Sequence, residues 1–247
     1  MKLSWILAAL GLATAGLHAK PPDKAYVLAW ADEFDQSRLD PARWDYRTDS
    51  KHWSTQLPAN VSVRDGCLWL ALKKQKSGDK EYTGAGVISK RAFKYGYYEA
   101  RFKVPPTAGW HTSFWMMKHN RSGSTDTSES VQELDVCEND SINPRRYGAN
   151  THRWLPTHVG VSGKAVTTPD LSADFHVWGC EFTAEKIVYY FEGKPVLTVE
   201  ATKLGEHSDQ HIWLTSIASH LGKTQTVDES RLPVYAVFEY VRFYERK

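Results

Sequence analysis

Three acidic residues stand close together in residues 133–138, a segment that otherwise has the apolar character of a buried strand. Side chains alternate between the two faces of a strand, so Glu133 and Asp135 point the same way and Glu138 points the other way. A β-bulge at residues 136–137 would add one position and bring all three carboxyl groups to one surface. The alternative is an edge strand with a solvated acidic face. Packing like charges together costs energy, so we expect the three acids to have a catalytic role.

Two carboxyl groups on either side of a glycosidic bond are the usual means of breaking that bond. Asp135 lies between the two glutamates, and a shared proton or hydrogen bond would keep Glu133 ionised. The neighbouring negative charge would raise the pKa of Glu138, so that Glu138 serves as the acid. With the bulge, the two outer carboxyl groups would approach the separation of roughly 5 to 5.5 Å that is typical of retaining enzymes.

Short alternating runs dominate the rest of the chain. In residues 96–104 polar and apolar positions alternate, which indicates a half-buried antiparallel strand. Similar runs occupy residues 61–63, 68–72, 87–89, 112–117, 158–161, 175–182, 187–191, 196–199, 212–217 and 235–244. These runs predict an all-β fold, a two-sheet antiparallel sandwich of the jelly-roll, concanavalin A-like type with a concave cleft. The Ser/Thr-rich residues 119–130 fit either a wall of that cleft or an unstructured surface insertion.

The first residues have the layout of a secretory signal peptide. An apolar stretch at residues 3–17 precedes small residues near Ala19, and the stretch is too short for a comfortable membrane span. We therefore expect residues 1–19 to be removed and residues 20–247 to form one catalytic domain. The mature protein would be secreted, to the extracellular space or the periplasm, without insertion into a membrane.

Composition excludes several other classes. The net formal charge of +2 gives no reason to expect nucleic acid or an anionic membrane as a partner. Cys67, Cys137 and Cys180 show neither a disulfide framework nor metal-site spacing, so we expect buried thiols, with a Cys67 to Cys180 bridge as the alternative. The histidines are scattered, and we expect no helix that carries a His-x-x-x-His pair. We expect a monomer that needs no cofactor for catalysis.

The chain resembles glycoside hydrolase family 16 over nearly its whole mature length. Members carry a Glu-x-Asp-x-(x)-Glu motif on a cleft strand of a jelly roll, and residues 133–138 match the bulged version. The other similar segments, in the family's order, are residues 30–34, 39–44, 82–90, 95–101, 109–116, 175–182 and 238–244. The resemblance implies cleavage of β-linked glucans or galactans with retention. By the same resemblance Glu133 is the nucleophile, Asp135 its partner and Glu138 the acid/base.

Aromatic residues near the acids are candidates for contact with substrate, because aromatic faces stack on the apolar faces of sugar rings. Trp110 and Trp115 are the best candidates. A regular extended segment brings only one of them to the cleft, and Trp115 is more similar to the family's cleft tryptophan. His152 and Trp154 lie in a polar run just after the acidic strand, which would bind sugar hydroxyls or else form a polar turn.

The sequence departs from the family pattern in two places. Many relatives hold a structural calcium opposite the cleft, and the resemblance implies Glu33 and Glu239 as its ligands, although Glu239 stands where the family has aspartate. Residues 214–222 differ from the late segment found in many enzymes that cut β-1,3-glucans. Plain laminarinase specificity is therefore not predicted.

We expect a secreted, endo-acting retaining β-glycosidase whose partner is a polysaccharide, either a β-1,3/1,4-glucan or a β-galactan. An alternative is a sulfated-galactan hydrolase of the porphyranase or carrageenase type, suggested by the nearby cations Lys118, Arg121, Arg145, Arg146, His152 and Arg153. Solvated loop charges are the favoured explanation of these cations, so a neutral glycan is the default. A non-catalytic carbohydrate-binding jelly roll would not need three repelling acids. A transglycosylase would use the same residues.

Overall fold

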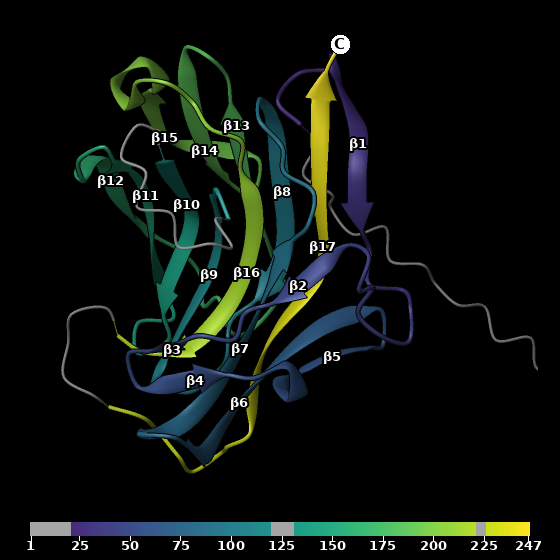
Figure 1. Cartoon of the computed structure of the whole chain (residues 1–247), viewed down its shortest axis with the longest axis vertical. Coiled ribbons are helices and arrows are strands. Elements are labelled where there is room, and N and C mark those ends of the chain that lie inside the picture. The colour runs from purple at the N-terminus through teal and green to yellow at the C-terminus, as the bar shows by residue number, and fades with distance from the viewer. Residues whose placement is uncertain (1–20, 120–130, 221–225) are drawn as a thin grey trace, which may run out of the picture.

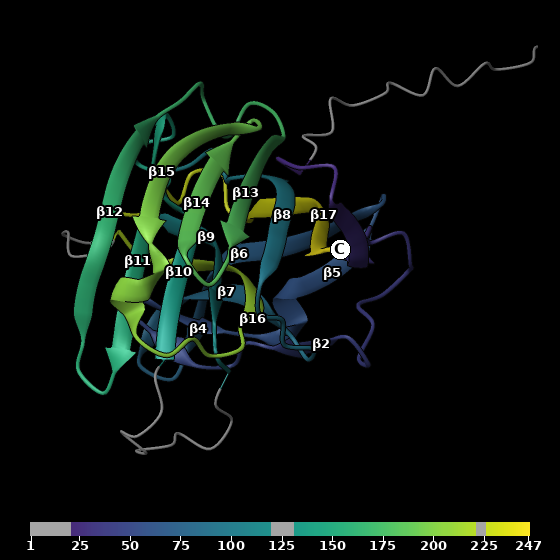
Figure 2. The ribbon, with the colours of Figure 1, turned by 90° about the horizontal axis from the view of Figure 1, so that it is seen from above.

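Two antiparallel sheets pack face to face in the computed structural model, which describes residues 21–119, 131–220 and 226–247 (Figure 1). The expected signal peptide and most of the 119–130 segment lie outside the described residues. Figure 2 shows the sheets as curved layers, with β1 (Tyr26–Asp32) beside β17 (Val234–Arg246). Apolar side chains from both layers fill the space between them. The predicted all-β sandwich of jelly-roll type is confirmed.

The sheet that carries the acids is called the cleft sheet here. Its strands run in the order β2-β7-β16-β9-β10-β11-β12, each antiparallel to the next. Their bounds are Trp44–Tyr46 (β2), Lys80–Ser89 (β7), His211–Ala218 (β16), Trp110–Met117 (β9), Val131–Asp140 (β10), Arg146–Leu155 (β11) and Val159–Thr167 (β12). Because β9, β10 and β11 are adjacent, side chains from three separate segments meet around the acids.

The second sheet, called the back sheet here, runs in the order β15-β14-β13-β8-β17. On the other side of β17, β6 and then β5 lie along its first half and β1 along its second half. The bounds are Lys194–Glu200 (β15), Lys186–Phe191 (β14), His176–Phe182 (β13), Gly96–Lys103 (β8), Cys67–Ser77 (β6) and Val61–Arg64 (β5). Short strands β3 (Ser50–Lys51) and β4 (Ser54–Gln56) pair beside β7, and the 3-10 turns are Pro58–Asn60 and Ala201–Leu204.

Strand β8 is buried on both faces up to Ala100, where a half-buried strand was expected, while Arg101 and Lys103 on its outer face are partly exposed. Its apolar face points into the core between the sheets, as the alternation predicts. On the other face, Tyr97 is 1% exposed and Glu99 is 0% exposed. Tyr26, Tyr190 and Tyr244 form an aromatic cluster around Tyr97 and shield that face from water. A carboxyl group is therefore buried on the back sheet as well as in the cleft.

Strand β10 contains the predicted bulge. The pairing of β10 with β9 shifts register between Asp135 and Cys137, and its pairing with β11 shifts between Asp135 and Glu138. Val136 and Cys137, which are adjacent in sequence, are both fully buried in the core between the sheets. Two inward residues in succession bring Glu138 to the same outer face as Glu133 and Asp135. The edge-strand alternative is wrong, because β10 is paired on both sides.

Strand β11 lies where a polar turn was the alternative for residues 150–154, and that alternative is wrong. Asn150, His152 and Trp154 alternate with more buried neighbours along one strand paired to β10. Their polar side chains face the cleft rather than bulk solvent alone. The alternating pattern is hidden in the sequence because the cleft face of this strand is as polar as a loop.

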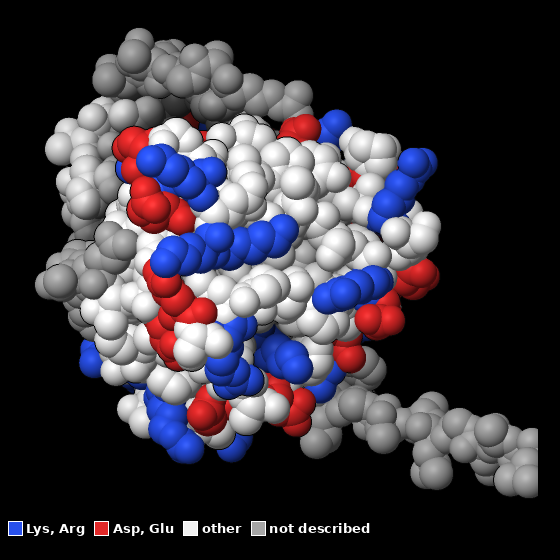
Figure 3. Space-filling model, turned by 90° about the horizontal axis from the view of Figure 1, so that it is seen from below, with Lys and Arg blue, Asp and Glu red and all other residues white. Residues whose placement is uncertain are grey.

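Several features bear on partners. Cys137 and Cys180 are buried, Cys67 is half-buried, and none of the three is in a disulfide bridge. Acidic and basic side chains are interspersed on the face shown in Figure 3 rather than gathered by sign. Within the described ranges, no helix has the length and apolar character that a membrane crossing requires.

Candidate active site

The outer face of the cleft sheet is hollowed around the acids. Glu133, Asp135 and Glu138 line a small central pocket together with Trp115. A cavity of about 760 Å³ adjoins this pocket at Glu133, and another of about 520 Å³ adjoins it at Glu138. The three acids therefore lie in the middle of a cleft that continues to both sides.

Glu133 is held by a tryptophan from the neighbouring strand. Trp154 donates its Nε1–H to Glu133 Oε2, with an N···O distance of 3.0 Å. The indole stacks on His158 with ring centroids 4.0 Å apart, and the His158 ring lies 5.5 Å from the ring of His152. This stack holds the indole of Trp154 in place, and the indole in turn orients the carboxyl group of Glu133.

Asp135 lies between the two glutamates and is 3% exposed. Burial raises the pKa of Asp135 well above its ordinary value, and the charges of Glu138 and Glu133 raise it further. A protonated Asp135 donates a hydrogen bond to Glu133. On its other side, Asp135 Oδ2 lies 3.6 Å from His152 Nε2. The geometry agrees with the expectation that Asp135 shares a proton with Glu133.

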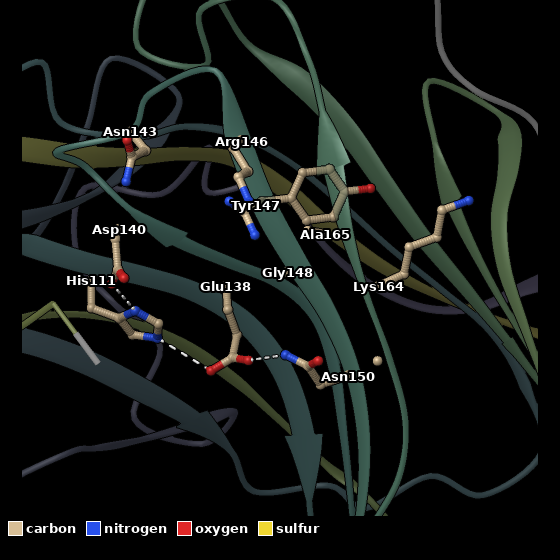
Figure 4. A pocket seen from close by; sticks show the side chains of 11 residues that line it. His111, Glu138, Asp140, Asn143, Arg146, Tyr147, Gly148, Asn150, Lys164 and Ala165 are labelled. Atoms are coloured by element: carbon tan, nitrogen blue, oxygen red, sulfur yellow. Dashed lines mark hydrogen bonds and ion pairs between the residues drawn. The ribbon is translucent and has the colours of Figure 1, made fainter. Parts of the chain in front are cut away.

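Glu138 has polar neighbours from two different strands, which Figure 4 shows. Asn150 on β11 donates from Nδ2 to Glu138 Oε2 at 2.5 Å. His111 on β9 places its Nε2 3.4 Å from Glu138 Oε1, and its Nδ1 lies 2.9 Å from Asp140 Oδ1. Both oxygens of Glu138 are thus oriented, one by an amide and one by an imidazole.

The electrostatics of the two glutamates differ from the expectation. Burial raises the pKa of Glu133, and the hydrogen bond from Trp154 opposes this only in part. Burial also acts to raise the pKa of Glu138, but the hydrogen bond and charge of His111, with Asn150, lower it overall. The expected raised pKa of Glu138 is therefore wrong for the substrate-free protein. No sequence pattern had placed His111 beside Glu138.

Trp115 and Trp213 form an aromatic surface beside Glu133. Their rings stack with centroids 4.5 Å apart and planes inclined by 28°, and both side chains are half-buried. Trp115 also donates its Nε1–H to Thr215 Oγ1 at 3.2 Å, which fixes its orientation. A fixed, half-exposed pair of this kind suits the apolar face of a sugar ring. Trp115 and Trp154 both line the larger cavity, as a substrate-binding role requires.

Trp110 does not belong to the site, and its assignment to substrate binding is wrong. Its side chain is 0% exposed and packs edge-on against Tyr82 at 6.0 Å, in a core cluster that also contains Leu72. Trp110 and Trp115 are five positions apart on the same strand, so they point to opposite faces. Only Trp115 reaches the cleft.

Comparison with known proteins agrees with this geometry. The model of the "Beta-porphyranase A-D, GH16 domain" matches residues 26–218, most of the described chain. The chain belongs to glycoside hydrolase family 16. It is therefore an O-glycosyl hydrolase of a family in which a retaining mechanism is characteristic. A β-glucanase from Rhodothermus marinus is 27% identical over an alignment of 248 positions, which covers 90% of this chain and 87% of that protein.

Two further relatives show the range of the family. β-Porphyranase D from Zobellia galactanivorans is 31% identical over 195 residues, which cover 65% of this chain and 45% of that longer protein. Among solved structures, the laminarinase from Rhodothermus marinus matches with a TM-score of 0.77 and 25% identity, covering 89% of this chain and 97% of that one. These matches confirm the family and the fold that the sequence resemblance implied.

Glu33 and Glu239, the calcium ligands that the sequence resemblance implied, each have an arginine partner. Glu33 accepts two hydrogen bonds from Arg242, with N···O distances of 2.7 and 2.8 Å. Glu239 is paired with a different arginine, Arg101. Each carboxylate is already neutralised by its own guanidinium group, and a cation would have to displace both arginines. Calcium binding by Glu33 and Glu239 stays a prediction, in which the ion would compete with Arg242 and Arg101.

One group among the described residues brings three potential metal ligands together. Atoms of Glu133, Asp135 and His152 lie within 4.8 Å of one another. Trp154 already donates to Glu133, and Asp135 shares a hydrogen bond with Glu133. Both carboxyl groups of this group thus already have hydrogen-bond partners within the protein.

Sequence reasoning missed His111 and Trp213 and gave Asn150 no role of its own. Trp213 had a usable signal, because it alternates with the core residues Ile212 and Leu214 on β16. His111 had none, since a single histidine inside an apolar strand is more often a satisfied structural residue. Its role depends on two carboxylates that come from the adjacent strand.

Proposed function

We propose that this domain hydrolyses internal linkages of a neutral β-linked glucan or galactan, with Glu133 as nucleophile, Asp135 as its partner and Glu138 as acid/base. The observation that carries the proposal is the bulged strand, which brings all three carboxyl groups to the middle of one cleft. Cavities adjoin the acids on both sides, so a polymer can cross them and be cut within its length.

In the first step Glu133 attacks the anomeric carbon while Glu138 protonates the departing oxygen, which gives a covalent glycosyl-enzyme. The hydrogen bond from Asp135 stabilises the negative charge of Glu133 before the attack. In the second step Glu138 takes a proton from water, the water attacks the anomeric carbon, and Glu133 is released. Two inversions at the same carbon give the product the configuration of the substrate.

Residues outside the acid motif bind the sugar in this proposal. Trp115 and Trp213 supply the face on which a pyranose ring stacks beside Glu133. Trp154 and His152, on the opposite strand, form the other wall near the nucleophile. An aromatic floor with polar walls binds a ring that has apolar faces and hydroxyl edges.

We also propose that the protein is exported and acts as a monomer on a polymer outside the cell. The support for export is the layout of residues 1–19 and the nature of the substrate, since a polysaccharide chain is too large to cross a membrane before it is cut. The proposed catalytic residues include no cysteine, and none of the three cysteines is in a disulfide bridge. These two features fit a protein inside the cell as well as an exported one.

A second candidate substrate is a sulfated galactan, and two observations favour it. The matching family model is that of porphyranases. In addition, Arg146 lines the cavity beside Glu138, and Lys51 lines the central pocket. A guanidinium group binds sulfate in a fixed fork geometry. Of the other cations considered, Arg121 lies outside the described residues, and exposed loop charges contribute little without a preorganised partner.

The test is turnover of laminarin, mixed-linkage glucan, agarose, porphyran and carrageenan at low and high salt. We expect salt-independent cutting of an uncharged polymer into oligosaccharides, with the β anomer as the first product in NMR. Activity confined to a sulfated polymer and suppressed by salt would overturn the neutral substrate. A first-formed α anomer would refute retention, and sugar monomers released from chain ends would refute endo-action.

A further inference from the structure

His111 is a buried histidine with a carboxyl group at each ring nitrogen (Figure 4). Nδ1 faces Asp140 Oδ1 and Nε2 faces Glu138 Oε1. When both facing carboxyl groups are ionised, His111 can donate to both only if each ring nitrogen carries a proton, which is the imidazolium form. Burial alone lowers the pKa of His111, but the hydrogen bonds to Asp140 and Glu138 raise it to about 9.

Other charged groups surround the same pockets. Those that line the two cavities around His111 are Arg47, Lys51, His52, Glu133, Asp135, Glu138, Asp140, Arg146 and Lys164. Arg47 is paired with Asp49, and Lys164 donates to the carbonyl of Val196, so neither cation is directed at His111. On β16 an uncharged isoleucine stands opposite His111. The two carboxylates of β10 are the groups within hydrogen-bonding or ion-pairing distance of His111.

This ion pair creates a difficulty for catalysis. A general acid must carry a proton when the glycosidic bond breaks. Beside an imidazolium, Glu138 is ionised in the substrate-free protein, as its lowered pKa also indicates. His111 Nε2, 3.4 Å from Glu138 Oε1, can supply a titratable proton, which the amide of Asn150 cannot.

We propose that His111 is a positioning residue that stores the catalytic proton in the free enzyme and passes it to Glu138 when a sugar fills the cleft. The inference rests on the proposed function, in which Glu138 is the acid/base. Entry of a sugar expels water from the pocket, and loss of water disfavours an ion pair relative to a neutral pair.

The proton balance closes over the reaction cycle. First the Nε2–H bond of His111 breaks and an O–H bond forms at Glu138 Oε1, which leaves a neutral imidazole and a neutral acid. Glu138 then gives this proton to the glycosidic oxygen as the bond to the leaving group breaks. In the second step the Glu138 carboxylate takes a proton from the attacking water and returns it to His111. One water is consumed, and the protein regains its starting state.

The first test needs no substrate, so it can fail independently of the proposed function. The imidazole of His111 is followed by ¹⁵N NMR across pH in the free protein, and its signals are assigned by their loss in His111→Gln. We expect both nitrogens to remain protonated to about pH 9, and the pKa to fall by at least one unit in Glu138→Gln. Titration near the ordinary value of 6.5, or no change in Glu138→Gln, would overturn the inference.

The second test is the pH dependence of kcat/KM for His111→Gln on the polymer that the panel identifies. The proton is then held by Glu138 alone, so the alkaline limb should move to lower pH by at least about one unit. Asp140→Asn, which keeps the imidazole, should move the limb in the same direction by less. Asp140→Asn also provides this test if His111→Gln does not fold.

The matched control is His176→Gln. His176 also faces a carboxylate, Glu192, at 3.0 Å, but it lies on the back sheet away from the cleft. This variant should leave the alkaline limb in place. If His111→Gln lowers kcat and its alkaline limb stays where the wild-type limb lies, the histidine is merely structural and the proposed proton storage is wrong.

Discussion

The cleft sheet and the back sheet each bury carboxyl groups among strand residues, and different partners surround them. On the back sheet, Glu99 accepts a hydrogen bond from the hydroxyl of Tyr240 at 3.0 Å, and Arg242 lies 4.0 Å away. Burial dominates there and raises the pKa of Glu99 to about 7. In the cleft, burial also acts to raise the pKa of Glu138, but the imidazole of His111 and the amide of Asn150 lower it overall.

The difference shows what burial alone can and cannot do. Low polarity raises the pKa of any carboxyl group, and it does so on both sheets. The imidazole beside Glu138 reverses the direction, whereas the tyrosine and the arginine beside Glu99 do not. We therefore expect the cleft acids to govern rate and Glu99 to govern stability.

The largest expected effect is that of Glu133→Gln. Loss of the nucleophile ends covalent catalysis, so kcat should fall by about 10⁴-fold or more. The melting temperature should stay constant or rise, because one of three repelling charges is removed. Glu99→Gln is the matched control and should keep its activity. Substantial turnover by Glu133→Gln would contradict the assignment of the nucleophile.

Trp110→Ala should act on stability rather than on substrate binding. Removal of a fully buried indole should lower the free energy of unfolding by about 3 to 5 kcal/mol, measured by urea denaturation. Trp115→Ala, from the same strand but the opposite face, should change KM and leave the free energy of unfolding nearly unaltered. A raised KM for folded Trp110→Ala would return that residue to the site.

Glu99 should make stability depend on pH in a specific direction. Its pKa is raised from 4.5 to about 7 on folding, so the folded protein holds the proton more tightly than the unfolded chain. The contribution to stability is complete below about pH 4.5 and is lost as pH rises through about 7. Relative to wild type, Glu99→Gln should therefore gain roughly 2 kcal/mol between pH 4.5 and 8. A pH-independent difference in the free energy of unfolding would show that Glu99 does not titrate in this range.

Trp213→Ala should have the smallest effect of the four. Loss of half of the stacked pair should raise KM by about tenfold, which corresponds to about 1.4 kcal/mol of binding. Trp69→Ala is the control, since Trp69 packs against Tyr235 on the back sheet. If both variants bind the polymer equally well, the aromatic surface beside Glu133 is not a sugar platform.

Features that depend on neighbours in sequence were predictable. The bulge follows from the parity of positions 133, 135 and 138, and the different fates of Trp110 and Trp115 follow from parity along β9. Both are local rules of strand geometry. The runs of alternating residues likewise marked most of the strands, because one face of each strand must enter the core.

Features that depend on contacts between strands were not predictable. The cleft face of β11 is polar, so the strand resembles a loop in sequence. The lowered pKa of Glu138 depends on His111, which lies 27 positions earlier (138 minus 111) and meets Glu138 only because β9 pairs with β10. The arginine partners of Glu33 and Glu239, Arg242 and Arg101, likewise come from other strands.

The bulge leaves the thiol of Cys137 sealed directly beneath the acids. Burial, reinforced by the charge of Glu138, raises the pKa of Cys137 well above its ordinary value, so an alkylating reagent cannot attack it in the closed fold. Its labelling rate therefore reports how often β10 detaches from the core. Cys180 is equally buried on the back sheet, so its labelling rate reports the opening of that sheet. A bound polymer should therefore slow the labelling of Cys137 more than the labelling of Cys180.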